Sequence, residues 1–122
     1  MGGPLELEAT RQAHVAALEQ GLASLVQQLS RMPDVRQVIL FGSFASGRRD
    51  LFSDLDLLVV MDSTLDFVAR NAQLAGAVRA GVALDLLAYT PEEMETMRRR
   101  PFMRHALGHA RVLYERRPSS RE

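Results

Sequence analysis

Two aspartates stand at the start of an apolar run within residues 42–60, GSFASGRRDLFSDLDLLVV. If this run is a β-strand, Asp54 and Asp56 project from the same face, because side chains alternate along a strand. Neighbouring carboxylates repel one another unless a proton or a cation neutralises them. Their oxygen atoms suit Mg²⁺, which commonly takes one or two carboxylates together with phosphate oxygens and water. The pair therefore predicts a metal site.

A third acid, Asp85, stands alone inside another apolar run, VALDLLAY. A carboxylate in such a run needs a cation, a ligand or an ionic partner. If the two runs form neighbouring strands, Asp54, Asp56 and Asp85 converge on one metal centre. The alternative is a buried acid that is paired with an arginine.

A glycine and a serine, Gly42 and Ser43, directly follow a third apolar run, VRQVILF. Glycine allows the backbone to approach a ligand closely, and serine offers a hydroxyl and an amide that favour phosphate where a strand passes into a helical turn. A metal centre of acids that faces a phosphate-binding turn is used for in-line phosphoryl or nucleotidyl transfer. Each part taken singly has a simpler explanation, either a solvated DxD triplet or an ordinary turn.

Apolar residues at helical spacing predict the two longer helices. The first is expected from Leu5 to Ser30, and its buried stripe is Val15, Leu18, Leu22, Leu25 and Leu29. The second is expected from Thr64 to Arg79 and is closed by Gly81. Its inner face would carry Leu65, Val68, Ala72, Ala75 and Val78.

Shorter elements complete the chain. Thr90, Pro91 and Glu93 have the pattern of an N-cap, a first-turn proline and a capping-box partner, which starts a helix at Pro91. Another short helix is expected after Pro101. Strands are expected at residues 35–41, 54–61, 82–89 and 111–115.

This alternation of helices and strands predicts an α/β (α+β) fold in a single domain, residues 1–117. We expect a short mixed β-sheet flanked by helices on one side, with the acids at one edge of an open cleft. The run at residues 54–61 is nearly all apolar, so we expect that strand to be covered on both faces. Residues 118–122 are expected to form a flexible polar tail.

Composition excludes several classes of function. The 122 residues have a formal net charge of zero, so no overall field draws the chain to nucleic acid, and we expect no nucleic-acid acceptor. The absence of cysteine excludes disulfides and thiolate chemistry. The chain opens without the pattern of a secretory signal and has no run of membrane-spanning length, so we expect a cytoplasmic protein without a membrane partner.

The stretch from Gly42 to Val60 resembles the signature of the polymerase β nucleotidyltransferase superfamily, in its smallest branch, the minimal nucleotidyltransferases. The ten-residue gap between Gly42-Ser43 and the DxD triplet, the serine before Asp54 and the flanking apolar residues all match. The likeness continues through the third-acid strand to VLYE near the end of the chain. It implies a polymerase-β-like core.

This resemblance also implies roles for the residues. Asp54 and Asp56 would bind two Mg²⁺ ions that bridge ATP or another nucleoside triphosphate, and Asp85 would bind the catalytic metal and help to deprotonate the attacking hydroxyl. Gly42 and Ser43 would hold the β and γ phosphates. The branch includes antitoxins that transfer AMP to a tyrosine of a HEPN ribonuclease, so the resemblance implies a HEPN-domain partner. Residues 86–122 are too few for a separate substrate-binding domain, and we expect a partner to supply that surface.

Two other functions stay open at this stage. One keeps the enzyme class and uses a small-molecule acceptor, as aminoglycoside nucleotidyltransferases do. The other is a non-catalytic antitoxin that masks its partner by binding.

Several further residues have two interpretations each. Arg48 and Arg49 are either solvated loop charges or phosphate contacts. Arg98, Arg99, Arg100 and Arg104 either complement the end of a helix or contact an acidic partner or RNA.

Met94, Met97 and Met103 are expected to fill the core. His105 and His109 are expected to be structural or exposed, since a metal site would need a third ligand. Tyr89 and Tyr114 are expected near strand ends, and a nucleotide contact of Tyr89 is a further hypothesis.

Overall fold

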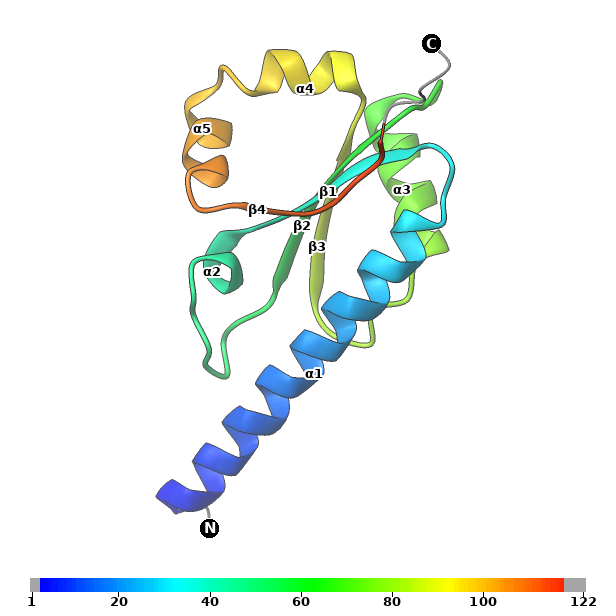
Figure 1. The fold of residues 1–122 in the computed structure, drawn as a ribbon. Coiled ribbons are helices and arrows are strands. Elements are labelled where there is room, and N and C mark those ends of the chain that lie inside the picture. The colour runs from blue at the N-terminus through cyan, green and yellow to red at the C-terminus, as the bar shows by residue number, and fades with distance from the viewer. Residues whose placement is uncertain (1–2, 118–122) are drawn as a thin grey trace.

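The computed structural model describes residues 3–117 and arranges them around a four-stranded sheet (Figure 1). The elements are α1 (Pro4–Ser30), β1 (Val35–Phe41), α2 (Gly42–Ala45), β2 (Leu55–Met61), α3 (Phe67–Ala77), β3 (Leu84–Tyr89), α4 (Pro91–Met97), α5 (Pro101–Leu107) and β4 (Arg111–Glu115). The tail predicted at residues 118–122 lies outside the described residues. No helix within residues 3–117 has the length and apolar character needed to cross a bilayer.

The sheet is mixed, as expected, with strand order β3-β2-β1-β4. β1 runs antiparallel to β2 and β4, whereas β2 and β3 are parallel. The carboxyl end of β1 therefore meets the amino ends of β2 and β3. In this register Phe41 lies opposite Asp56, and Asp56 lies opposite Asp85. The topology thus brings Gly42, which follows Phe41, to the two acids.

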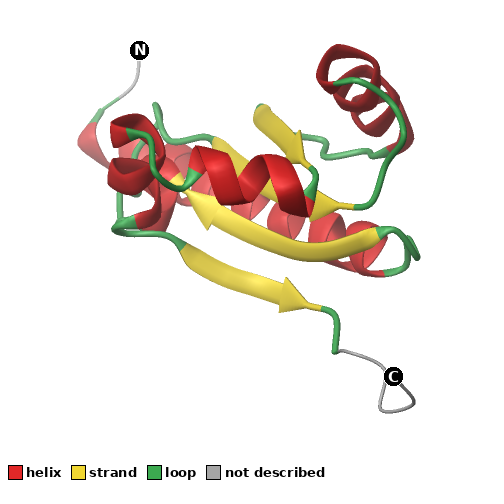
Figure 2. Cartoon of the chain, turned by 90° about the horizontal axis from the view of Figure 1, so that it is seen from above, coloured by secondary structure: helices red, strands yellow, loops and turns green. Residues whose placement is uncertain are grey.

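Helices cover both faces of the sheet (Figure 2), so the prediction of helices on one side is wrong. Leu57 and Val59 of β2 belong to a core cluster with residues of α1 and α3. The alternate residues Leu58 and Val60 pack instead in a cluster that contains Met94 of α4 and Met103 of α5. The predicted burial of β2 on both faces is confirmed.

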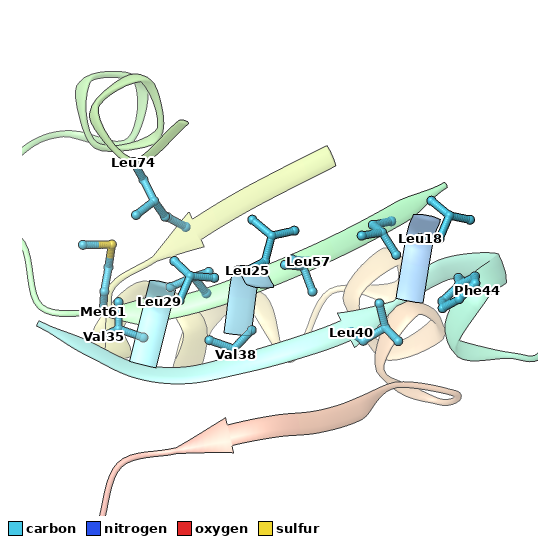
Figure 3. Packing of buried hydrophobic residues seen from close by; sticks show 13 residues of the cluster. Leu18, Leu25, Leu29, Val35, Val38, Leu40, Phe44, Leu57, Met61 and Leu74 are labelled. Carbon is cyan, nitrogen blue, oxygen red and sulfur yellow. The ribbon is translucent and has the colours of Figure 1, made fainter. Parts of the chain in front are cut away.

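The first cluster lies between α1 and the sheet (Figure 3). Leu18, Leu25 and Leu29 of α1 are fully buried, and Val15 and Leu22 are half-buried, which confirms the predicted stripe. The amino-terminal part of α1 extends past the sheet (Figure 1), and Leu5 there is 87% exposed.

The inner face predicted for α3 is wrong. Arg70 and Leu74 are its buried residues, whereas Val68 is 77% exposed. The helix starts at Phe67 because the Asp66 side chain accepts a hydrogen bond from the Ala69 amide at 2.8 Å. It ends at Ala77, so Gly81, with φ +70°, lies in the turn that follows and does not cap the helix.

An arginine occupies the inner face because its charge is met by polar groups. The Arg70 guanidinium donates to both carboxylate oxygens of Glu93, at 2.6 and 3.1 Å, and to the Ala88 and Leu65 carbonyls. Glu93 also closes the predicted capping box with Thr90, which is confirmed. These contacts link α3, α4 and the edge strand β3.

Candidate active site

Asp56 and Asp85 are register partners on the parallel strands β2 and β3. Asp85 lies close enough for its hydrogen bonding and its charge to act on the Asp56 carboxyl group. Burial chiefly, and then the charge of Asp54 and the hydrogen bond and charge of Asp85, together raise the pKa of Asp56 to about 6. Near neutral pH this group is therefore close to the point where it loses its proton.

Gly42 lies directly against the Asp56 carboxylate. A Cβ atom on residue 42 would come within 2.2 Å of Asp56 Oδ2 and 2.8 Å of its Cγ. The backbone φ of Gly42 is +77°, which side chains other than glycine rarely adopt. Both observations require glycine at this position, so the close approach of backbone and carboxylate is part of the fold.

Asp54 immediately precedes β2 and is positioned by a hydrogen-bonded loop. The buried Ser53 hydroxyl donates to the Arg48 carbonyl at 3.0 Å and accepts from the Asp50 amide at 3.1 Å. The ring of His14, on α1, hydrogen-bonds the Ser53 carbonyl at 2.8 Å. Sequence reasoning included Ser53 only as part of a matching motif. The structure shows that its hydroxyl fixes the turn before Asp54.

The three acids have no basic partner in the described part of the chain. None of the ion pairs found in residues 3–117 includes Asp54, Asp56 or Asp85. The alternative that Asp85 is buried and paired with an arginine is therefore wrong. Asp85 is exposed, because β3 is an edge strand.

The described residues contain no ready-made group of three or more metal-binding side chains. Both Asp54 and Asp85 lie near enough to Asp56 to raise its pKa, Asp54 by its charge and Asp85 by its hydrogen bond and charge. A pair of carboxylates without a basic partner, of which Asp56 has a raised pKa, fits a divalent cation, and Mg²⁺ requires only one or two carboxylates. The convergence of all three acids on a metal remains a prediction.

A pocket of about 460 Å³ opens beside this pair. Its sheet side is formed by Phe41, Gly42, Ser43, Ser46 and Asp56, and its other side by Phe102, His105, Ala106 and His109. The Ser43 hydroxyl makes no hydrogen bond with another group among the described residues. That hydroxyl and the Asp56 carboxyl are therefore polar groups available to a ligand in the pocket.

Arg48 and Arg49 hold the loop rather than the pocket. Arg48 pairs with Asp50 at 2.7 Å at the surface. The Arg49 guanidinium lies 3.6 Å from the centroid of the Phe44 ring and donates to the Phe44 carbonyl at 2.7 Å. Arg49 is not a purely solvated charge, because it packs against α2, and a phosphate contact of Arg48 or Arg49 stays a prediction.

The remaining ambiguous residues are placed as follows. Met94 and Met103 are buried and Met97 packs beside them, as predicted. Tyr89 is buried with its ring 5.2 Å from that of Phe67, and four residues of strand, about 13 Å, separate it from Asp85. Tyr89 therefore belongs to the core.

Tyr114 is half-buried against the first cluster. The exposed residues Arg98, Arg99 and Arg100 follow the end of α4, and Arg104 lies on α5.

His105 and His109 are exposed, as expected, but they line the pocket opposite Gly42 and Ser43. Sequence reasoning missed this placement. Their spacing permitted a shared helix face, but α5 ends at Leu107 and His109 lies in the turn beyond it. The direction in which α5 folds back over the sheet depends on the turn between α4 and α5.

Comparison with known proteins agrees with this geometry. The family model described as Polymerase beta, Nucleotidyltransferase matches residues 23–119. A protein of Methanocaldococcus jannaschii, named "Putative protein adenylyltransferase", is 31% identical over 80 residues, which is 66% of this chain and 79% of that protein.

Two solved structures were matched, and the first of them shows a similar fold. The crystal structure of a "putative nucleotidyltransferase" from Sulfolobus solfataricus has a TM-score of 0.55 at 17% identity, over 95% of this chain and 93% of that one. A toxin-antitoxin structure with AMP-PNP has a TM-score of 0.49 at 23% identity, over 80% of this chain and 73% of that one. The match of the family model over most of the sequence is decisive. The chain belongs to the polymerase β nucleotidyltransferase family.

Proposed function

We propose that this chain is a Mg²⁺-dependent nucleotidyltransferase that moves AMP from ATP to a hydroxyl of a HEPN-type partner protein and thereby acts as an antitoxin. The observation that carries the proposal is the contact of the Gly42 backbone with the Asp56 carboxyl, at the point where Asp56 meets Asp85. Family membership and the name of the 31% identical relative support adenylyl transfer. The GSx10DxD spacing supports the antitoxin role.

Different residues would bind the phosphates and the metal ions. Gly42 and Ser43 would hold the phosphates at the end of β1, where the backbone approaches closely and the hydroxyl is available. Asp54, Asp56 and Asp85 would hold two Mg²⁺ ions. Bound Mg²⁺ would neutralise the carboxylates and the phosphate charge and stabilise the oxygen that departs.

Asp85 would act on the acceptor hydroxyl. The acceptor oxygen attacks the α-phosphorus of ATP, the bond from that phosphorus to the bridging oxygen breaks, and pyrophosphate leaves. The acceptor proton passes to the Asp85 carboxylate. Because Asp85 is exposed on an edge strand, a hydroxyl on the surface of a folded protein can approach it from solvent.

The acceptor is tested by intact-mass spectrometry after incubation with ATP, Mg²⁺ and a candidate acceptor. One added AMP is expected on a HEPN-type protein that is incubated as the acceptor. An adduct on an aminoglycoside-type alcohol instead would favour the small-molecule function. A tight complex with no adduct, unchanged by Asp54→Asn, would favour masking without chemistry.

A further inference from the structure

One wall of the pocket has no role in the reaction described above. Phe102, His105, Ala106 and His109 form it, opposite Gly42 and Asp56. Phe102, His105 and Ala106 stand at positions i, i+3 and i+4 of α5 and so share one face of that helix, and His109 lies in the turn that follows it.

The opposite face of α5 explains why this wall is held in place. Met103 is 1% exposed and packs with Leu107 in the cluster that covers the sheet. Pro101 starts the helix. The helix is therefore anchored by its inner face, and the face with Phe102 is left toward the pocket. Phe102 is 62% exposed there, although a phenylalanine side chain gains free energy when it is covered.

One wall of the pocket has groups that suit the phosphates of a nucleotide, and the other wall has groups that suit its base and ribose. The sheet wall has Ser43, Asp56 and a bare backbone at Gly42, which suit phosphates and their cations. The α5 wall has an exposed aromatic ring and two imidazoles. Aromatic rings stack on nucleobases, and imidazole nitrogens donate or accept hydrogen bonds. A volume of about 460 Å³ lies within the range of small-molecule sites.

We propose that the α5 wall binds the nucleoside half of the triphosphate, with the base stacked on Phe102 and its edge or the ribose hydrogen-bonded by His105 and His109. This inference rests on the proposed function, because it takes the triphosphate to lie at Gly42 and Ser43. It assigns base recognition to residues of a separate helix from those that hold the phosphates.

The test compares binding of Mg²⁺-ATP with binding of Mg²⁺-tripolyphosphate by calorimetry. Wild type should bind ATP more tightly, because only ATP has a base and a ribose. Phe102→Ala should lower ATP affinity by roughly 5- to 150-fold and leave tripolyphosphate binding unchanged. Phe102→Tyr, which keeps the stacking surface, should retain ATP affinity. Phe52→Ala is the matched control, because Phe52 is 80% exposed and does not line the pocket.

The histidines are tested in the same assay. His105→Ala and His109→Ala should each weaken ATP binding by about fivefold, with no effect on tripolyphosphate. If they weakened tripolyphosphate binding equally, they would contact phosphates, and their assignment to the nucleoside would be wrong.

The outcomes separate the two levels of the proposal. If wild type bound ATP and tripolyphosphate equally, or if Phe102→Ala kept the full preference for ATP, the nucleoside site would be overturned while the transfer site stood. If wild type bound neither ligand, the proposed function itself would fail. Because Phe102 is largely exposed, its variants should keep the wild-type melting temperature.

Discussion

The backbone of Gly42 and the carboxyl of Asp56 occupy adjoining space with no room for a Cβ atom between them. Gly42→Ala should therefore destabilise the fold by about 3 kcal/mol, through the strain of a positive φ together with the collision. Gly47→Ala is the matched control, because Gly47 has φ +108° and nothing within 4 Å of its added Cβ. Its cost should be only about 1–2 kcal/mol. If urea unfolding showed that Gly42→Ala and Gly47→Ala lose the same free energy of unfolding, the collision with Asp56 would be refuted.

Stability should depend on pH through Asp56. Its pKa is about 6 in the folded chain against 3.8 for an ordinary aspartate, so the folded state holds this proton more strongly. The stabilisation of the folded state by this proton is complete below about pH 4 and is lost as pH rises toward 6. After allowance for solvent screening we expect a loss of about 1–2 kcal/mol.

The quantity to measure is the difference in free energy of unfolding between wild type and Asp56→Asn at each pH. Taking the difference removes the contribution of Glu93, which is the same in both proteins. The hydrogen bond with Arg70 chiefly lowers the pKa of Glu93, so Glu93 makes stability rise with pH, opposite to Asp56. Asp56→Asn should be the more stable protein at pH 7, and the difference should shrink below pH 4. Parallel stability curves from pH 3 to 7 would contradict the raised pKa. Asp34→Asn, at the far end of β1, is the control substitution.

Mg²⁺ should stabilise the chain through the same carboxylates. A ligand that binds only the folded state at ten times its Kd contributes about 1.4 kcal/mol. We expect a rise in melting temperature for wild type at pH 7 that a chelator reverses, and a much smaller rise for Asp56→Asn. An equal rise in both proteins would place the cation elsewhere.

The pair of Arg70 and Glu93 should be strongly coupled. Glu93→Gln keeps the capping box and removes only the charge, so it leaves a buried guanidinium without its anion, at a cost of about 2 kcal/mol. In an Arg70→Met background the same change should cost less than about 0.5 kcal/mol. The neighbouring Glu92→Gln is exposed and serves as control. Additive losses in this double-mutant cycle would refute the coupling.

The residues of the sheet wall could be predicted from the sequence because local patterns fix them. Gly42 follows a strand and Asp56 lies near the start of one, as the patterns predicted, whereas Asp54 lies just before β2 and not within it. The exposure of Asp85 could not be predicted in this way, because it depends on β3 being an edge strand, and strand order is a property of the whole sheet.

The errors in α3 and α5 have a similar origin. Val68 belongs to an apolar stripe, but Arg70 is the residue buried, because Glu93 and two backbone carbonyls from elsewhere in the chain meet its charge. The placement of His105 and His109 at the pocket depends on how α5 folds over the sheet. Such long-range contacts leave no local signal in the sequence.

The most direct test of the central claim is label transfer from ATP in the presence of Mg²⁺ and the HEPN-type partner. ATP labelled at the α-phosphate should label the partner, whereas ATP labelled at the γ-phosphate should not, because pyrophosphate leaves. Asp54→Asn and Asp56→Asn should abolish the label while the proteins stay folded, and Asp34→Asn should retain it. Full transfer by Asp56→Asn, or label from the γ-phosphate, would contradict the account.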